Sequence, residues 1–588
     1  MFDIEQKKVE EKINQFLVEN DLPEISFQWN WIPFSGHWGI STSLFSLAAT
    51  EARLKKSKIN VPARAKELAD TIANFIGTPD GFEKVESING YLNLYFSQTD
   101  YAKKVLKEVL NLKDDFGRIT RKNQHVMVEF SQPNTHKAFH VGHLRSAILG
   151  DTLARILDFA GYDVVRANYP GDMGLHVIKW LWCYQNFHVG ETPENDITQW
   201  MGKIYAEANS KLEANDELEG EIRALYKKWD ERDPFIVDLW EKTRAWSLKG
   251  FYQIYEKLNI HFDVYYFNSQ MEQPGKEIVQ ELIQKNIATD ERPEGAVIVK
   301  IDEVLGLQKD KYRVLVVLRS DGTALYATED LALVKQKFID YPDLSKALYI
   351  VDVRQSLHFT QVFKTMELAG YDFATKCEHV PYELVSLPGN VVMASREGTV
   401  VLLEDLINEA TKRAYEVVQE KNPELMEEQK IATAEAVGIG AIKYPMQARE
   451  NTKVVTFDWE SALDFNGQAA PYIQYAYVRC GSILRKADTE KLELLDINYE
   501  LTPQEVQLID LISRFSQEVE RAGEERRTIQ IANYAYELAK TFNNFYTHCP
   551  VLSAEGSIRT TRLNLVFATR QVLKNNLTLL GITAPEAM

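Results

Sequence analysis

The feature that most constrains the fold is a strand, a polar loop and a helix in immediate succession. An apolar strand over 126–130 leads into the polar segment 133–139, and residues 140–143 then open a long amphipathic helix that ends at Gly161. A second strand is predicted over 164–168. This order is a βαβ unit, which predicts a parallel sheet with ligands bound at the carboxyl ends of its strands.

The start of that helix has the chemistry of an anion site. Gly142 lets the backbone approach a ligand closely, and the unpaired amides and the helix dipole favour negative charge. His140 and His143 flank the glycine and can donate hydrogen bonds to charge that develops on phosphorus. A His-x-Gly-His pattern is weak alone, because a single histidine is more often a core or surface residue. Its place after a strand and at a helix start favours a polyphosphate site.

Composition limits the class of protein. A chain of 588 residues is too long for one core, and its 45% hydrophobic and 26% charged residues indicate several globular domains without wholesale disorder. No apolar run reaches the roughly eighteen residues of a membrane span, and the acidic N-terminus is not a signal peptide, so we expect a cytoplasmic protein. The net charge of −18 argues against indiscriminate coating of nucleic acid, but it leaves room for a local RNA-binding face.

The cysteines indicate neither a disulfide framework nor a metal centre. All four lie far apart in the sequence, without the close pairs of a zinc site. We therefore expect reduced, structural thiols and no metal bound by the protein itself. The four are Cys183, Cys377, Cys480 and Cys549.

The pattern of elements predicts three domains. Residues 1–117 combine helices with an alternating strand over 90–96 and are predicted to form an α+β domain. Residues 118–458 are predicted to form an α/β, Rossmann-like domain whose parallel sheet is interrupted by a helical insertion at about 180–268. Residues 459–588 show only helical periodicity. Further strands are predicted at 295–299, 312–318 and 348–351, with a hairpin turn at Asp321-Gly322 and a helix from about 355 to 368.

A second polar loop, over 393–399, follows a strand and precedes a helix that contains Leu403 and Leu406. Alone it would be an ordinary surface loop. In one chain with the His-x-Gly-His segment, it resembles the mobile loop that closes over ATP in class I aminoacyl-tRNA synthetases.

Three stretches in the right order resemble arginyl-tRNA synthetases, and the resemblance covers essentially the whole chain. They are residues 131–146, residues 319–326, and Asp464-Phe465 with 471–476. The resemblance implies a class I catalytic domain, an N-terminal domain that binds the D-loop at the tRNA elbow and an all-α anticodon-binding domain. It also implies a monomer that activates L-arginine with ATP and its Mg²⁺, requires bound tRNA for that step, and transfers arginine to the terminal 2′-hydroxyl of tRNA(Arg).

The closing loop departs from the family pattern. The family motif is Lys-Met-Ser-Lys-Ser, whereas here Val392 stands at the first lysine and Ser395 at the second. Arginyl enzymes without the second lysine resemble this chain in carrying a lysine three residues before the His-x-Gly-His, here Lys137. The resemblance implies that Lys137 and Arg396 hold the departing pyrophosphate. The alternative for Lys137 is a solvated loop residue.

Arginine needs a carboxylate for its planar guanidinium and an aromatic face to stack on it. Tyr326 and Asp330 stand one helical turn apart and resemble the family's guanidinium-binding pair; alternatively, Asp330 favours a helix start and Tyr326 fills a core. Asn134, Gln355 and Glu129 match the residues that hold the amino and carboxylate groups of the substrate.

The remaining predicted contacts also come from the resemblance. The ATP site is expected to include His140, Gly142, His143, Gly171, Asp172, His358, Met393 and Ser395. The segment at Gly171 could equally be a tight turn, and the polar residues near His358 could serve only to cap a helix. Expected tRNA contacts are Tyr472, Tyr475, Tyr546 and Met588 at the anticodon, and Tyr91 and Asn93, with Tyr95, at the D-loop. Tyrosines three apart are more often core residues.

Two other functions stay open at this point. One is a small-molecule adenylating enzyme with the same phosphate site, which would not need the C-terminal helices. The other is a catalytically silent RNA-binding relative, which the altered closing loop favours. Intact histidines and an intact guanidinium-binding pair count against it.

Overall fold

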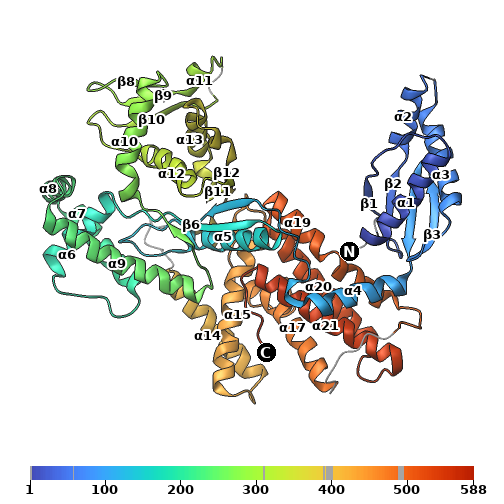
Figure 1. The fold of residues 1–588 in the computed structure, drawn as a ribbon. Helices are drawn as coiled ribbons and strands as arrows, with labels where there is room; N and C mark the ends of the chain where they lie inside the picture. Colours follow the sequence, from blue (N-terminus) through green and yellow to red (C-terminus); the bar gives the residue numbers. More distant parts are fainter. Residues whose placement is uncertain are drawn as a thin grey trace. The chain divides into compact units, whose positions relative to one another are not determined.

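The computed structural model describes residues 3–32, 34–56, 58–308, 311–387, 391–392, 402–487 and 496–588. The chain forms two compact units (Figure 1). One comprises 1–116, 476–515 and 537–575, and the other comprises 117–475, 516–536 and 576–588. The C-terminal helices therefore contribute to both units, and the three predicted domain boundaries stay a prediction.

The first unit contains a four-stranded antiparallel sheet in the order β1-β2-β4-β3. Leu92, Leu94 and Phe96 are buried on one face of β4, while Tyr91, Asn93 and Tyr95 alternate with them, which confirms that these three share a face. The elements are α1 (Asp3–Glu19), β1 (Trp29–Trp31), β2 (Gly39–Ser43), α2 (Phe45–Leu54), α3 (Val61–Ile76), β3 (Phe82–Ile88), β4 (Tyr91–Phe96) and α4 (Gln98–Leu112).

The second unit is built on a five-stranded parallel sheet in the order β12-β11-β5-β6-β7. The predicted βαβ unit is confirmed as β5 (His125–Glu129), α5 (Val141–Phe159) and β6 (Asp163–Asn168). The other strands are β7 (Val264–Tyr265), β11 (Leu344–Asp352) and β12 (Cys377–Tyr382). Because β6 and β11 lie on opposite sides of β5, the chain changes direction there, and the carboxyl ends of these strands form the expected ligand edge.

Close packing fixes the position of α5 on this sheet. Phe130 is fully buried, and a Cβ atom at Gly150 would lie 2.1 Å from its side chain. A glycine is therefore required for the helix to lie this near the end of β5. The N-terminus of α5 is thereby held over the ends of the strands.

The predicted helical insertion is confirmed as a bundle that packs on its own core (Figure 1). Trp180, Trp229 and Trp240 are among its buried residues. The last helix begins with a bonded cap at Asp233 and a proline in its first turn. The helices are α6 (Leu175–Phe187), α7 (Ile197–Ala214), α8 (Glu219–Asp230) and α9 (Pro234–Lys257).

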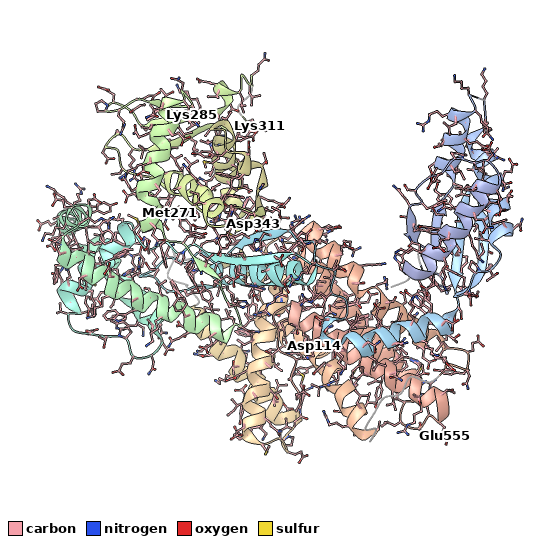
Figure 2. The ribbon with its side chains drawn as sticks, in the orientation of Figure 1. Asp114, Met271, Lys285, Lys311, Asp343 and Glu555 are labelled. Atoms are coloured by element: carbon pink, nitrogen blue, oxygen red, sulfur yellow. The ribbon has the colours of Figure 1, made fainter. Side chains whose placement is uncertain are left out.

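Strands β8, β9 and β10 form a separate antiparallel sheet in the order β10-β9-β8. The predicted hairpin turn at Asp321-Gly322 is confirmed by a bond from Gly322 N–H to the Arg319 carbonyl (2.9 Å) and by an antiparallel bridge between Leu318 and Ala324, and α12 begins two residues later. Figure 2 labels Met271 and Lys285 near the two ends of α10; Met271 is buried, and Lys285 Nζ donates to the Ala369 carbonyl at 2.7 Å. The elements are α10 (Asn268–Gln284), β8 (Ala288–Asp290), β9 (Val297–Lys300), α11 (Ile301–Val304), β10 (Val314–Leu318) and α12 (Tyr326–Asp340).

The remainder of the chain is mainly helical. Among the described residues the last strand is β15 (Val455–Thr456), as predicted. Each of the four cysteines is a free thiol, and no described helix has the length and apolar character needed to cross a bilayer. The elements are α13 (Ser356–Leu368), β13 (Val385–Leu387), β14 (Val391–Val392), α14 (Leu403–Lys421), α15 (Glu427–Gln447), α16 (Trp459–Ala462), α17 (Ala470–Lys486), α18 (Pro503–Ser513), α19 (Phe515–Glu525), α20 (Thr528–His548) and α21 (Gly556–Leu579).

Candidate active site

The loop that joins β5 to α5 has a strained backbone. Ser131, Gln132 and His136 have φ values of 79°, 42° and 60°, which non-glycine residues rarely adopt. Their backbone amides donate to Ser146 Oγ (3.0 Å), Asn168 Oδ1 (3.1 Å) and Ser247 Oγ (2.9 Å), respectively. These three hydrogen bonds hold the loop in its strained conformation, and the loop in turn positions the residues that follow it at the start of α5.

His136 is a positioning residue that the sequence analysis missed. Its Nδ1 lies 2.9 Å from Thr135 Oγ1, and its Nε2 lies 2.8 Å from Thr243 Oγ1 on α9. Burial lowers the pKa of this imidazole well below its ordinary value, so the ring is neutral. His136 therefore connects the loop to the helical insertion. The only sign of this role in the sequence is that His136 stands between predicted site residues.

His140 is preorganised as a hydrogen-bond donor. It caps α5, with Nδ1 accepting the Gly142 N–H at 3.1 Å, so in the neutral ring the proton is on Nε2. A Cβ atom at Gly142 would lie 2.9 Å from the same ring, which explains the glycine. Burial, and secondly the charge of Lys137, lower the pKa of His140 to about 4. The ring stacks on His143 with centroids 3.9 Å apart.

Unused nitrogens and a cation gather beside this helix start. Among the described residues, His143 Nδ1 and His176 Nε2 are buried without a hydrogen-bond partner. Burial lowers the pKa of His143 well below its ordinary value and that of His176 to about 3, and the charge of Lys137 lowers both further. Lys137 therefore lies near these rings, with Nζ 5.1 Å from the centroid of Tyr205. Neutral imidazoles, one ammonium and a helix N-terminus fit the phosphates of ATP.

Asn134 and Gly171 lie in contact at the ends of adjacent strands. They form an isolated parallel bridge, and Gly171 N–H donates to the Pro133 carbonyl at 3.0 Å. A Cβ atom at Gly171 would lie 2.4 Å from Asn134 Oδ1. This glycine therefore sets the position of the Asn134 amide, a role more specific than a simple tight turn.

Asp172 is bonded on both side-chain oxygens within the protein. Its side chain is fully buried, and its carboxylate accepts bonds from Arg244 (2.8 Å) and from the amide (2.9 Å) and hydroxyl (2.7 Å) of Ser269. With both oxygens engaged, this carboxylate joins α9 and α10 to the loop after β6. The carboxylate therefore has a structural role, and an ATP contact at Asp172 stays a prediction.

The predicted guanidinium pair lies at the start of α12, as the spacing indicated. Asp330 Oδ2 lies 2.5 Å from His358 Nε2, whereas Tyr326, the first residue of α12, leaves 75% of its side chain exposed. The structure therefore brings His358, predicted at the ATP site, against Asp330. The exposed ring of Tyr326 is free to stack on a planar cation. Gln355 is exposed at the start of α13 and makes no side-chain cap there.

Glu129 already has partners at the end of β5. One oxygen pairs with the buried Lys337 Nζ, and the other accepts from Gln132 Nε2 at 3.0 Å. Lys337 Nζ also lies 3.7 Å from the ring centroid of Tyr349. If Glu129 bound the substrate directly, it would have to use the oxygen that now accepts a hydrogen bond from Gln132.

Two further residues were missed. Glu329, beside Asp330 on α12, is buried and accepts a bond from Asn268, and burial raises its pKa to about 7. The hydroxyl of Tyr169 is buried with no partner among the described residues. After burial, the charges of Asp330, Glu329, Glu129 and Asp172 raise the pKa of that phenol. Because Glu129 and Asp172 are each paired with a cation, Asp330 and Glu329 are the acidic groups at this edge that suit a cationic substrate.

Both flanks of the predicted closing loop are attached near this site. β14 pairs with β13, while Leu402 bridges His140 and the Leu403 N–H donates to the Phe139 carbonyl at 3.1 Å. Arg145, buried in α5, donates to carbonyls just before β13 and just after α15. Met393, Ser395 and Arg396 lie outside the described residues.

The residues predicted to contact tRNA differ in their exposure. Tyr475 and Tyr546 are 37% and 40% exposed, and Tyr472 is half-buried with its ring 5.3 Å from Tyr536. Tyr91 is 46% exposed, and Asn93 accepts from Ser41 Oγ at 2.6 Å. Met588 packs against a small cluster on α14 and α15. These residues stay predictions for tRNA.

Comparison with known proteins decides the family. Residues 105–459 match the family model described as tRNA synthetases class I (R), catalytic domain. The arginine–tRNA ligase of Clostridium perfringens is 36% identical over 531 residues, which cover 89% of this chain and 90% of that protein. The chain belongs to the arginyl-tRNA synthetase family. Residues 473–588 match the DALR anticodon binding domain.

Other relatives agree. The arginine–tRNA ligase of Clostridioides difficile is 34% identical over 528 residues, covering 89% of this chain and 90% of that protein. The solved Thermus thermophilus arginyl-tRNA synthetase superimposes with a TM-score of 0.77 at 27% identity, covering 99% of this chain and all of that chain. The expected class I fold and enzyme class are confirmed: the chain is an aminoacyl-tRNA synthetase that uses ATP, and the small-molecule adenylating alternative falls away.

Proposed function

We propose that the chain joins L-arginine to ATP at the carboxyl ends of β5, β6 and β11, and then transfers arginine to the terminal 2′-hydroxyl of tRNA(Arg). One observation supports this most directly: an acidic group of residues suited to a cation lies at the same sheet edge as a helix start suited to phosphates. The acidic residues suit arginine and the helix start suits ATP, and these are the two substrates of arginine activation.

Arginine carries a guanidinium and an ammonium, so an acidic site favours it. We place the guanidinium against Asp330, held by His358, with Glu329 beside it and Tyr326 stacked on its plane. Asn134, positioned by Gly171, and Gln355 would bind the amino and carboxylate groups. Glu129 would act through Gln132, because Lys337 already neutralises it.

The first step is attack by the arginine carboxylate on the α-phosphate of ATP, with pyrophosphate leaving in line. The protein positions the reactants and stabilises charge. His140 would donate a hydrogen bond from Nε2 to the charge that develops on the phosphate, with the His143 ring beside it. Lys137 would bind the pyrophosphate. Mg²⁺ would arrive with the phosphates of ATP, and we assign it no protein ligand. Arg396 stays the predicted second clamp.

In the second step, the 2′-hydroxyl of the terminal adenosine attacks the carbonyl of arginyl-adenylate and AMP leaves. No described residue is placed as the general base, so the phosphate of the adenylate would take the proton. The tRNA would be held by base stacking on the exposed tyrosines of the C-terminal helices, at about 1–3 kcal/mol for each base. The face of Tyr91, Asn93 and Tyr95 would contact the D-loop. A monomer and a cytoplasmic location stay predictions.

The test is tRNA charging with purified protein, together with ATP–pyrophosphate exchange in the presence and absence of tRNA(Arg). We expect charging with arginine and exchange that depends on tRNA. Charging with another amino acid would refute the substrate. A complete lack of charging and exchange with correctly folded protein would favour the catalytically silent alternative.

A further inference from the structure

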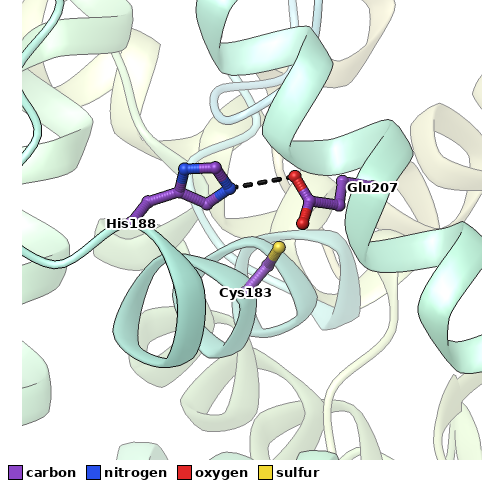
Figure 3. Close-up of side chains that lie close together, drawn as sticks. All are labelled: Cys183, His188 and Glu207. Carbon is purple, nitrogen blue, oxygen red and sulfur yellow. Dashed lines mark hydrogen bonds and ion pairs between the residues drawn. The ribbon is translucent and has the colours of Figure 1, made fainter.

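The helical insertion contains a group of metal-ligating side chains outside the active site. Cys183 lies in the last turn of α6, His188 directly follows that helix, and Glu207 lies on α7. Their ligand atoms all lie within 4.8 Å of one another, and Figure 3 shows the three side chains converging. We infer that Cys183, His188 and Glu207 bind a Zn²⁺ ion.

The donor set fits zinc. Thiolate, imidazole and carboxylate are its usual ligands, and a sulfur ligand disfavours Mg²⁺ and Ca²⁺. In a tetrahedral site, neighbouring ligand atoms would lie about 3.3–3.6 Å apart. His188 Nε2 and Glu207 Oε2, now 2.9 Å apart, would separate slightly, and the sulfur would move in by up to about 1.2 Å. Water would complete the fourth position.

The surroundings also suit a metal. The second nitrogen of His188, Nδ1, lies 3.1 Å from Glu191 Oε2, so a carboxylate holds the ring with Nε2 directed at the cluster, as is usual behind zinc-bound histidines. The thiol of Cys183 is buried, whereas the side chains of His188 and Glu207 are 19% and 37% exposed. The exposed pair gives the ion a path from solvent.

Charge balance is satisfied. Zn²⁺ displaces to solvent the proton of the Cys183 thiol and the proton that His188 Nε2 shares with Glu207, while Nδ1 keeps its proton toward Glu191. The resulting thiolate and the Glu207 carboxylate neutralise the two positive charges. Lys211 Nζ lies 3.4 Å from Glu207 Oε1 and competes with the metal for this carboxylate. A cysteine-protease-like triad is a poorer interpretation, because both nitrogens of His188 already bond carboxylates and the ring is not placed to take the thiol proton.

The ion would fasten the end of α6 to α7 within the insertion. No sequence pattern indicates this site, since one cysteine, a histidine five residues later and a distant glutamate match no zinc motif. The proposed site is independent of the proposed aminoacylation mechanism, because none of its residues is placed in the catalytic or substrate-binding group.

The test uses the full chain after treatment with a chelator. Titration with Co²⁺ should produce the thiolate-to-metal charge-transfer absorption of a cysteine ligand, and Zn²⁺ should displace it at one ion per chain. Cys183→Ser should abolish this absorption and weaken zinc binding at least about 100-fold, since even loss of an outer partner costs about 10–100-fold. Cys377→Ser, which alters a half-buried thiol elsewhere, should keep both.

Other variants make the test independent of the buried thiol. His188→Ala and Glu207→Gln, at partly exposed positions, should also weaken zinc binding, and Glu191→Gln should weaken it about tenfold. Lys211→Met removes the competitor and should tighten binding about two- to fivefold, the equivalent of a surface ion pair. The proposal is overturned if no charge-transfer absorption develops, if it survives in Cys183→Ser, or if His188→Ala binds zinc as the wild type does.

Discussion

Replacing Gly171 by alanine should disable the active site without disturbing the fold. The φ angle of Gly171 is not in the left-handed region, so alanine is compatible with the backbone. The added Cβ, however, would lie 2.4 Å from Asn134 Oδ1, whereas its next neighbour, Asn268 Oδ1, would be at an ordinary 3.6 Å. The substitution therefore acts almost entirely on the Asn134 amide.

The structure gives the expected magnitude. An ordinary contact needs about 3.4 Å, so Asn134 Oδ1 must move by about 1 Å, and a displacement of this size at a reacting substrate costs about 100-fold. We therefore expect kcat/KM for arginine to fall about 100-fold in tRNA charging, equivalent to about 2.7 kcal/mol of transition-state stabilisation. The melting temperature should change little. Gly220→Ala is the matched control, because no atom lies within 4 Å of its added Cβ.

A double-mutant cycle tests the reasoning itself. In an Asn134→Ala background the clashing oxygen is absent, so adding Gly171→Ala should cost less than about threefold, leaving a coupling energy of about 2 kcal/mol. If Gly171→Ala were equally damaging in both backgrounds, or harmless in the wild type, the proposed contact would not position Asn134 for catalysis.

Three further perturbations follow from the same contacts. Lys137→Ala should lower the rate of tRNA-dependent pyrophosphate exchange at least about tenfold with little change in arginine affinity, while Lys203→Ala, an exposed lysine on α7, leaves it unchanged; an unaffected rate would make Lys137 a solvated residue. Because burial raises the pKa of Glu329 from 4.5 to about 7, the carboxyl becomes protonated as pH falls through 7, and KM for arginine should rise from pH 8 to pH 6; Glu329→Gln should remove this dependence, and a persisting pH profile would exclude Glu329 as its source. The same carboxyl binds its proton more tightly in the folded state, so stability should fall as pH rises from about 4.5 to 7 and Glu329→Gln should abolish that fall in thermal unfolding. Gly150→Ala, which places a Cβ 2.1 Å from Phe130, should lower the melting temperature by the equivalent of about 1–3 kcal/mol, and an unchanged midpoint would show that the helix can move away.

Local sequence patterns were sufficient to predict the helices and strands and the phosphate-binding part of the site. The helical spacing of apolar residues in α5 and the apolar run in β5 reflect burial that each segment must satisfy wherever it lies, so these elements were predictable. The β-to-α turn with His140, Gly142 and His143 is contiguous in the chain, and its function follows from the helix start itself. The helical insertion was predictable for the same reason.

Contacts between distant segments were not predictable. Three features depend on which side chains come into contact at the sheet edge. Asp330 pairs with His358, and Arg244 and Ser269 occupy both oxygens of the Asp172 carboxylate. The third is the raised pKa of Glu329. Short-range sequence patterns do not predict these contacts, because the burial of a group and the charges around it are set only when separate elements pack together.

The sequence by itself determined the family, the βαβ phosphate site and the residue types available for arginine, since these depend on contiguous motifs and on composition. Only the tertiary structure decided what each charged group does. It set Asp172 as a structural anchor, made Gly171 the support of Asn134, and brought His188 and Glu207 to Cys183. The physical reason is that desolvation and Coulomb interactions act over a few ångströms in space, whatever the separation along the chain.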